Sequence, residues 1–386
     1  MLKILAHYNT VDNEENRSIF LAACNKLTYI IDCIAQTEQV QIISASNTLN
    51  KTKSPRKIKK ISDNIQLTLL RGFARGGWLR NKFSTLLFTL QLYAYLFFNI
   101  KKEDTLLVYH SLSYMKYLKW LKRVKKFKLI LEVEEIYGDV LSSAKTVRKE
   151  LSFFKTADAY IFPTVLLHEK VNVANKPYTI IHGTYQVEKQ IGQKFNDGRI
   201  HCVYAGTFDP RKGALAAVSA AKFLNKRYHI HILGFGSEND KKSLIDTIAE
   251  VNQISKCRVT YDGLLFGEDY IRFIQSCDIG LSTQNPDAAF NDTSFPSKVL
   301  SYLANGLRVV SVCIHVLETS EVNDLLHYYK ENTPEEIAKA IQKVDMTISY
   351  DSRKRIKELD KKFQKGIREI IGVRDATCNK CNSSCL

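Results

Sequence analysis

Short apolar runs alternate with longer amphipathic segments along the chain. This alternation favours parallel sheets with helices on both faces. A polar stretch with two glycines, 188–199, interrupts the pattern and is typical of a linker. The strands expected before it lie at 2–8, 40–44, 65–70, 105–110, 128–134, 159–163 and 178–183, with helical stretches such as 111–125 and 143–156 between them.

A second alternating set follows the linker. The pattern predicts two tandem doubly wound, Rossmann-like α/β domains with a cleft between them, toward which the carboxyl ends of both sheets face. We expect an N-terminal domain at 1–187, a C-terminal domain at 200–345, a helix at 349–371 that crosses back to the first domain, and a tail at 372–386. The second set has strands at 200–206, 228–236, 257–263, 277–283 and 307–313, and helices at 213–224, 238–250, 267–275 and 296–305.

Composition and charge narrow the class of protein. Apolar residues make up 45% and charged residues 25% of the 386 residues, as in a globular protein. The net charge is +16, and bases gather without acids at 51–60 and 116–128. Such runs form a solvated face or attract anionic lipid headgroups. No nucleic-acid-binding motif accompanies them, so a nucleic acid partner is not expected.

The longest apolar stretch, 83–100, contains Ser, Thr, Gln, Asn and Tyr. A spanning helix needs about 20 mostly apolar residues. Two interpretations stay open: a buried helix, or a helix docked on a bilayer surface beside the basic stretches. The apolar run at the N-terminus is too short for a signal peptide. We therefore expect a cytoplasmic protein, with a peripheral position on the inner face of the cell membrane as the alternative to a free one.

Nine cysteines fall into two groups. Six lie inside apolar runs and are expected to be small buried hydrophobes in a reducing compartment. The other three, Cys378, Cys381 and Cys385, crowd the tail. They suit either a polar tail or a metal site that lacks an obvious fourth ligand, so no metal site is predicted.

Two glycine turns follow strands of the second half. In "YAGTFDPRKG" (204–213) a strand ends at Gly206 and Thr207, and Arg211 and Lys212 precede a helix. Gly lets the backbone approach a ligand, and bases beside a helix N-terminus attract anions. The alternative is a surface turn with solvated bases. "ILGFGSE" (232–238) contributes Gly234 but lacks the third glycine of a dinucleotide-binding turn.

The stretch "DTSFPSKVLSYLANGLRVVS" (292–311) predicts a helix whose start binds an anion. Pro296 fits the first helical position, where its missing N–H costs nothing, and Thr293 or Ser294 can cap the helix. The free N–H groups and one cation then favour a diphosphate ligand, with Arg211 and Lys212 facing it. These N–H groups belong to Ser297, Lys298 and Val299.

Taken together, the motifs of the second half resemble the nucleotide-binding domain of the group 1 (family 4) glycosyltransferases of the GT-B fold. The motifs are "GTFDPRKG", "ILGFG", "YDGLL", "CDIGLS" and "FPSKVLSYLANGLRVVS", over about 200–345. The resemblance implies retaining, metal-independent sugar transfer from a nucleoside-diphosphate sugar, with UDP or GDP as the nucleotide and no other cofactor. It also implies that Lys212 holds the diphosphate and that the base lies near Gly263 and Leu264.

The chain departs from the pattern at three positions. Relatives often carry two glutamates where Thr293 and Ser301 stand here, and an arginine in place of Thr207. Ser301 can hydrogen-bond the donor ribose, without the charge assistance of a glutamate. The departures put the identity of the donor in question.

The first half is expected to bind the acceptor. Glu134 or Glu135 in "LEVEEIYGD" (131–139) follows a strand and is the candidate to orient or deprotonate an acceptor hydroxyl; the alternative is an N-cap acid. His110 also ends a strand, where a structural role is expected. Asn16 and Arg17 are candidates to face the donor.

The predicted function is transfer of a sugar to a saccharide or lipid-linked acceptor in surface polysaccharide synthesis. Two alternatives are a nucleotide-sugar epimerase of the same fold and a non-catalytic, transferase-like partner protein. The epimerase needs several acids and bases at one sugar carbon, and the sequence offers no such set.

Overall fold

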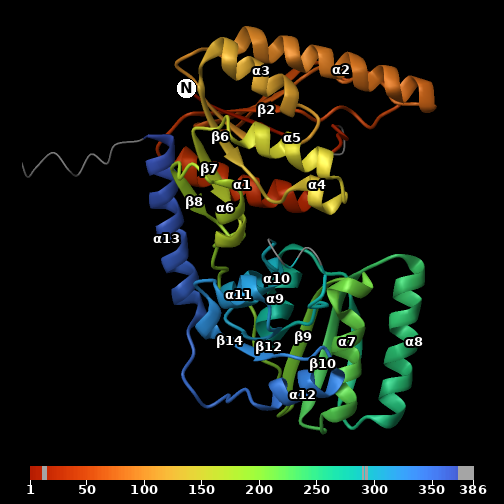
Figure 1. Cartoon of the computed structure of the whole chain (residues 1–386). Coiled ribbons are helices and arrows are strands. Elements are labelled where there is room, and N and C mark those ends of the chain that lie inside the picture. Colours follow the sequence, from red (N-terminus) through yellow and green to blue (C-terminus); the bar gives the residue numbers. More distant parts are fainter. Residues whose placement is uncertain (11–14, 289–290, 292–293, 373–386) are drawn as a thin grey trace, which may run out of the picture. The chain divides into compact units, whose positions relative to one another are not determined.

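The computed structural model describes residues 1–386 apart from 11–14, 289–290, 292–293 and 373–386 (Figure 1). The chain divides into two compact units. Unit 1 comprises Met1–Pro163, Leu167–Ile181 and the chain from Lys362 onward, and unit 2 comprises Thr164–Leu166 and His182–Lys361. The last helix, α13 (Ser352–Ile371), therefore begins in unit 2 and ends in unit 1.

The described part of unit 1 contains an eight-stranded sheet in the order β3-β4-β2-β1-β5-β6-β7-β8. The pairs are parallel except β3–β4, which is antiparallel. The edge strand β3 was not predicted, because its lysines were interpreted as a solvated basic run. The strands are β1 (Leu2–Ala6), β2 (Val40–Ser44), β3 (Lys57–Ser62), β4 (Ile65–Leu69), β5 (Thr105–Tyr109), β6 (Lys128–Glu132), β7 (Ala159–Phe162) and β8 (Tyr178–Ile180).

Helices of the first half cover this sheet, and the long α2 buries only one side. Its buried residues, Ser84, Phe88, Leu92 and Leu96, recur every four positions, as one stripe of a helix does. The opposite side exposes large apolar side chains, so the expectation of a buried helix is wrong for that side. The helices are α1 (Leu21–Ala35), α2 (Trp78–Asn99), α3 (Met115–Lys125), α4 (Tyr137–Val140), α5 (Ala144–Phe154) and α6 (Val165–Val171).

The described part of unit 2 contains a six-stranded parallel sheet in the order β11-β10-β9-β12-β13-β14. The last strand and the helix after it were not predicted. The strands are β9 (Ile200–Thr207), β10 (Tyr228–Phe235), β11 (Arg258–Gly263), β12 (Ile279–Ser282), β13 (Arg308–Val312) and β14 (Leu326–Tyr329). The helices are α7 (Ala214–Ala220), α8 (Glu238–Ile254), α9 (Gly267–Ser276), α10 (Ser297–Ala304), α11 (His315–Glu318) and α12 (Pro334–Gln342).

The segment 188–199, expected to be a linker, is packed onto unit 2. The buried side chain of Gln275 on α9 accepts hydrogen bonds from the N–H groups of Ile191 and Gly192, both at 2.8 Å. The same amide donates to the Lys189 carbonyl at 2.8 Å. The linker interpretation is wrong because the polar backbone of this segment is satisfied by the domain that follows it.

Each sheet reverses its strand order at one point. The chain runs outward from β1 to β2 on one side and to β5 on the other, and from β9 to β10 and to β12. Ligands of open α/β sheets bind beyond the carboxyl ends of the strands at such points. The ends of β1 and β5 in unit 1, and of β9 and β12 in unit 2, are therefore the places to look for sites.

Five of the six cysteines in apolar runs are buried, as expected, and Cys313 is not. Cys24, Cys33, Cys202, Cys257 and Cys277 are buried and free, and Cys313 is half-buried and free. Cys378, Cys381 and Cys385 lie outside the described residues.

Candidate functional site

Lys298 lies at the start of α10 beside the end of β9. Its ammonium lies 3.8 Å from the ring centroid of Tyr204 and 3.4 Å from the carbonyl oxygen of Lys212. A Cβ added to Gly206 would lie 3.4 Å from the same nitrogen, so the strand end passes directly by the cation. Burial and the neighbouring Lys212 lower the pKa of Lys298 to about 7. A half-buried ammonium whose pKa is lowered in this way is suited to an anionic ligand.

Tyr204 anchors the loop between β9 and α7 through its hydroxyl. The buried hydroxyl of Tyr204 lies 2.8 Å from the carbonyl oxygen of Thr207 and 3.0 Å from that of Lys212, and it shares its proton between them. The ring therefore supports the loop and contacts Lys298 at once. This fixes the backbone around Lys212 relative to the start of α10.

The Arg211 side chain pairs with a nearby acid. Its guanidinium pairs with Asp209, with Nη2 2.6 Å from Oδ2, and its side chain is 68% exposed. Asp209 also accepts from the Arg211 N–H and so caps the short turn at 210–212. The Arg211 guanidinium is thus paired with Asp209, and its expected role beside Lys212 stays a prediction.

The start of α10 differs from the prediction by one residue. Pro296 is the N-cap rather than the first helical residue, with φ −68° and ψ 98°, and no side chain caps the helix there. The Val299 N–H donates to the Pro296 carbonyl at 3.0 Å and is not free. Helix geometry leaves the N–H groups of Ser297 and Lys298 without an intrahelical acceptor. Thr293, which was expected as a cap in alternative to Ser294, lies outside the described residues.

The remaining predicted residues line the same end of the sheet. Gly234 pairs with Gly206 across β10 and β9 and has φ +136°, and a Cβ on it would lie 1.7 Å from the Gly206 oxygen. Only glycine fits there. Gly263 ends β11 at φ +86°, and Leu264 after it is 43% exposed. The Ser301 hydroxyl lies 3.2 Å from the Tyr270 hydroxyl.

In unit 1 the predicted catalytic acid Glu134 lies in a charge cluster with the buried residues Lys26 and Glu132. Lys26 of α1 hydrogen-bonds Glu134 and lies 3.2 Å from Glu132. Burial and the Glu134 carboxylate raise the pKa of Glu132 well above its ordinary value. Burial opposes ionisation of Glu134 as well, but the Lys26 ammonium outweighs it and lowers the pKa of Glu134. Glu134 is thus a paired carboxylate and a weak base, and Glu135 beside it is half-buried.

His110 belongs to a second buried pair at the reversal point of unit 1. Its Nε2 lies 2.8 Å from Glu150, which also accepts from the N–H groups of Tyr137 and Gly138. His110 and Tyr137 line a cavity of about 50 Å³. His7, which follows β1, and Tyr109, which ends β5, line it as well. Among the described residues, His110 Nδ1 is buried without a hydrogen-bond partner.

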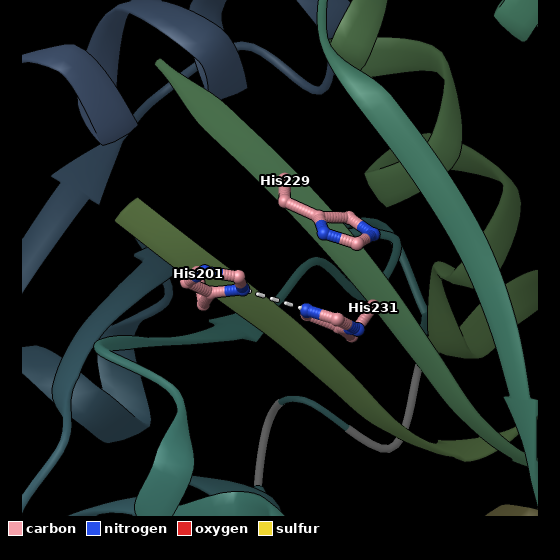
Figure 2. A group of neighbouring side chains, drawn as sticks. All are labelled: His201, His229 and His231. Carbon is pink, nitrogen blue, oxygen red and sulfur yellow. Dashed lines mark hydrogen bonds between the residues drawn. The ribbon is translucent and has the colours of Figure 1, made fainter. Parts of the chain in front are cut away.

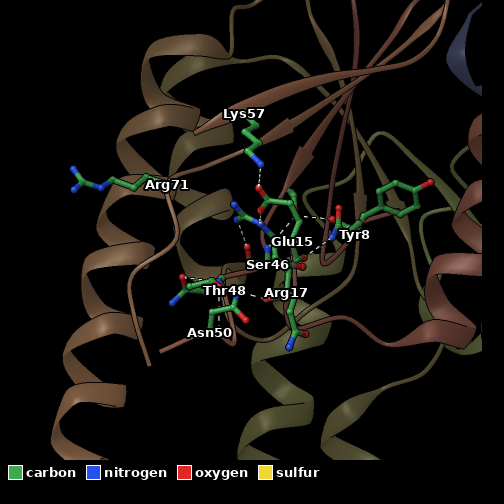
Figure 3. A network of polar contacts seen from close by, with 12 residues as sticks. Tyr8, Glu15, Arg17, Ser46, Thr48, Asn50, Lys57 and Arg71 are labelled. Atoms are coloured by element: carbon green, nitrogen blue, oxygen red, sulfur yellow. Dashed lines mark hydrogen bonds and ion pairs between the residues drawn. The ribbon is translucent and has the colours of Figure 1, made fainter. Parts of the chain in front are cut away.

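Arg17 serves the fold rather than a ligand (Figure 3). Its side chain is buried; Nη1 donates to the Ser46 carbonyl at 2.9 Å, and Nε lies 3.3 Å from Glu15. Lys57 of β3 lies 2.6 Å from the other Glu15 oxygen. The expectation for Arg17 is corrected, since its charge is paired with Glu15 inside unit 1. Asn16 is exposed.

Two residues of these sites escaped the sequence analysis. Lys26 is far in sequence from the acids that it contacts and belongs to no local motif. Tyr204 stands inside the quoted motif 204–213, so its place two residues before the turn glycine was a usable signal. Lys26 is a lone base in an apolar helix, which signals a buried partner without identifying it.

Comparison with known proteins finds similarity in structure alone. No protein-family model and no curated protein matches the sequence. A structure described as trehalose-6-phosphate from E. coli bound with UDP-2-fluoro glucose is similar at TM-score 0.65 and 11% identity, covering 96% of this chain and 97% of the other. HepE from *Anabaena* in complex with UDP is similar at TM-score 0.62 and 12% identity, covering 96% and 98%.

A third structure agrees with these two. The UDP-forming α,α-trehalose-phosphate synthase from *Burkholderia xenovorans*, in complex with glucose-6-phosphate, has TM-score 0.66 at 9% identity and covers 96% of this chain and 97% of the other. The likeness extends over both units. The chain therefore has the GT-B fold, an α/β architecture with two parallel-sheet domains.

Proposed function

We propose that this protein is a glycosyltransferase that moves a sugar from a nucleoside-diphosphate sugar to a saccharide or lipid-linked acceptor. One observation carries the proposal: the Lys298 ammonium lies against Tyr204 and the Lys212 carbonyl at the strand reversal of unit 2. Structures of the same fold contain UDP and UDP-2-fluoro glucose, which favours a uridine donor. Assignment to group 1 (family 4) is supported by the motif resemblance.

The diphosphate would bind where Lys298 and Lys212 meet the N–H groups of Ser297 and Lys298. Negative charge grows on the leaving diphosphate during sugar transfer, and fixed cations and N–H groups stabilise it without reorganisation. This source of charge makes a metal ion unnecessary in the proposed reaction. The base would lie near Gly263 and Leu264, and Ser301 would hydrogen-bond the ribose. Retention of configuration is the outcome that the resemblance implies.

The acceptor would bind in unit 1. Because Lys26 keeps Glu134 ionised, Glu134 is better suited to accept a hydrogen bond from an acceptor hydroxyl than to remove its proton. The leaving diphosphate would then take the proton. Glu135 is the neighbouring carboxylate proposed for the same task.

The exposed side of α2 favours a lipid-linked acceptor and a peripheral position on a membrane. None of the described helices is long and apolar enough to span a bilayer. The α2 surface is amphipathic instead, and the basic α3 packs beside it through stacking of Tyr93 on Tyr117 at 3.9 Å. An apolar face flanked by bases suits an anionic interface. The exposed apolar residues of α2 are Trp78, Leu79, Phe83, Leu86, Leu90 and Phe98.

The donor proposal is tested by thermal shift with UDP, GDP and dTDP, followed by titration calorimetry and a sugar-release assay. We expect UDP to stabilise the protein and sugar release to require an acceptor. Stabilisation by no nucleoside diphosphate would refute the proposal. Binding without transfer or hydrolysis would favour the non-catalytic partner, and conversion of a UDP-sugar without release would indicate the epimerase.

Sedimentation with vesicles tests the membrane position. Phe83→Glu/Leu86→Glu should reduce binding to anionic vesicles, and neutral vesicles should bind weakly. The control is Ile245→Glu/Ile254→Glu, which places the same charges on exposed apolar positions of α8 in unit 2. Equal binding by both double variants would contradict the proposal.

A further inference from the structure

Three buried histidines lie together at the amino ends of β9 and β10 (Figure 2). His201, His229 and His231 are 2%, 7% and 3% exposed. One ring nitrogen from each lies within 4.8 Å of the others. His229 and His231 share a face of β10 because side chains alternate along a strand, and the register places His229 opposite His201. The fold of unit 2 thus brings three potential metal ligands to one point.

The hydrogen-bond partners decide which nitrogens carry protons. His201 Nε2 lies 2.9 Å from Asp197, and His231 Nδ1 lies 3.1 Å from Asp262. Carboxylates at these distances accept, so each ring donates its N–H outward in its neutral form. The inner nitrogens, His201 Nδ1 and His231 Nε2, then face each other at 2.9 Å with lone pairs on both. Two facing lone pairs repel, and a cation between them removes the conflict.

The ring of His229 also donates its N–H to an outer acceptor. Thr260 donates its hydroxyl proton to Asp262 at 2.8 Å, so its oxygen is free to accept from His229 Nε2 at 3.0 Å. This leaves Nδ1 of His229 as the lone-pair nitrogen. All three imidazoles therefore have their N–H groups occupied by outer acceptors.

We propose that His201, His229 and His231 bind a divalent transition metal, with zinc as the best fit. Zinc takes imidazole nitrogens at about 2.0–2.1 Å in tetrahedral geometry, which separates two ligand nitrogens by about 3.3 Å. The pair at 2.9 Å needs to open by a few tenths of an ångström, and His229 needs to move inward. The acceptors Asp197, Asp262 and Thr260 supply the outer contacts that orient metal-binding histidines.

The surroundings suit a structural ion rather than a reacting one. Phe195 stacks on His201 at 4.1 Å and on His231 at 5.2 Å, so it covers the cluster from the segment 188–199. The ion would join β9, β10 and this covering segment. It would lie five residues before Gly206 along β9, which is about 16 Å at the rise of a strand. The metal site is therefore independent of the proposed diphosphate site.

The test uses the full chain with its purification tag removed, stripped with EDTA and titrated with Zn²⁺. We expect one zinc ion per chain, and a Co²⁺ derivative with the visible spectrum of a tetrahedral nitrogen and oxygen site. His229→Gln should lower zinc affinity at least tenfold while far-UV circular dichroism and UDP affinity stay unchanged. Asp262→Asn leaves the three ligands in place and should lower zinc affinity by about 10–100-fold, as loss of an outer contact does.

Two controls locate the metal. His315→Gln removes an exposed histidine and should leave zinc affinity unchanged. Replacement of Cys378, Cys381 and Cys385 by serine should also leave it unchanged. Absence of stoichiometric zinc binding in the wild type would mean that a proton, not a metal, joins the rings, and would overturn the proposal. Unchanged affinity in His229→Gln, or loss of the metal in the cysteine variant, would overturn it as well.

Discussion

The ammonium of Lys298 lies 3.8 Å from the ring centroid of Tyr204, and the Tyr204 hydroxyl holds the carbonyl of Lys212 at 3.0 Å. One aromatic side chain thus joins the strand end, the loop after it and the cation at the start of α10. A cation over an aromatic face is stabilised by about 0.5–2 kcal/mol, depending on its desolvation, and this offsets part of the desolvation of the half-buried Lys298 side chain. A bound anion can offset the remaining desolvation of the ammonium.

Lys298→Met should weaken UDP binding and stabilise the ligand-free protein. Loss of one charge-assisted contact costs roughly 1.5–3 kcal/mol, or about 10–100-fold in affinity. Removal of a half-buried charge whose pKa is lowered by desolvation should raise the Tm by about 2–4 °C. Titration calorimetry and thermal unfolding measure the two effects. Lys226→Met, at an exposed lysine of unit 2, should change neither.

The affinity for UDP should fall as pH rises above 7. The pKa of Lys298 is lowered from 10.5 to about 7 in the free site, and a bound diphosphate raises it again, so binding above pH 7 takes up a proton. The limiting slope is tenfold per pH unit. In the ligand-free protein the unfolded state binds this proton more tightly, so stability should rise from pH 7 toward 10. Calorimetry in buffers of different ionisation enthalpy detects the proton uptake, which Lys298→Met should abolish.

Tyr204→Phe should loosen the loop while keeping the ring against Lys298. We expect a loss of about 1 kcal/mol in unfolding free energy, because one buried hydrogen bond is removed, and a few-fold loss in UDP affinity. Tyr160→Phe is the matched control, since the Tyr160 hydroxyl donates to the Phe154 carbonyl at 2.7 Å in unit 1. It should lower stability without changing UDP affinity. Equal UDP affinity in all three proteins would contradict the role given to Tyr204.

Gly213→Ala should severely destabilise unit 2. Gly213 has φ +87°, and a Cβ on it would lie 1.7 Å from the Thr283 carbonyl oxygen, so the backbone must move. Gly198→Ala separates strain from collision, because Gly198 has φ +73° and open space around it. That variant should lose only about 1 kcal/mol, the cost of a left-handed L-residue. Denaturant unfolding compares the two, and similar losses would show that the contact with Thr283 is relaxed.

Glu132→Gln and Glu134→Gln should differ although the two acids share one lysine. Burial and the Glu134 carboxylate raise the pKa of Glu132 well above its ordinary value and so favour its protonated form, which an amide resembles, so this variant should cost little. Glu134→Gln leaves Lys26 buried without its ionised partner and should cost roughly 3 kcal/mol. Because the pKa of Glu134 is lowered on folding, this stabilisation is present above its ordinary value and is lost as pH falls below it. Unfolding at pH 7 and pH 4 measures both, and equal losses for the two variants would contradict the assignment.

Much of the architecture could be predicted because local patterns determine it. Central parallel strands such as β1 and β9 are continuous apolar runs, and Pro296 and Gly213 mark helix starts by their backbone geometry. The edge strand β3 could not be recognised, since an edge can carry lysines where a central strand cannot. The segment 188–199 looked like a linker because the partner that satisfies it, Gln275, lies far along the chain.

The candidate site, like the fold, could be predicted where local motifs determine it. Lys298 and Gly206 belong to motifs whose strand–turn–helix context fixes their neighbours. The pairing of Arg211 with Asp209, two residues away, was not predicted from the sequence. Lys26 and Glu134 are 108 residues apart, so only the tertiary fold brings them together.

Calorimetric titration of the purified protein with UDP and, separately, with uridine tests the central claim most directly. If the carboxyl end of β9 holds a pyrophosphate, UDP should bind at least tenfold more tightly than uridine. Equal binding of the two, or no binding of UDP, would contradict the account.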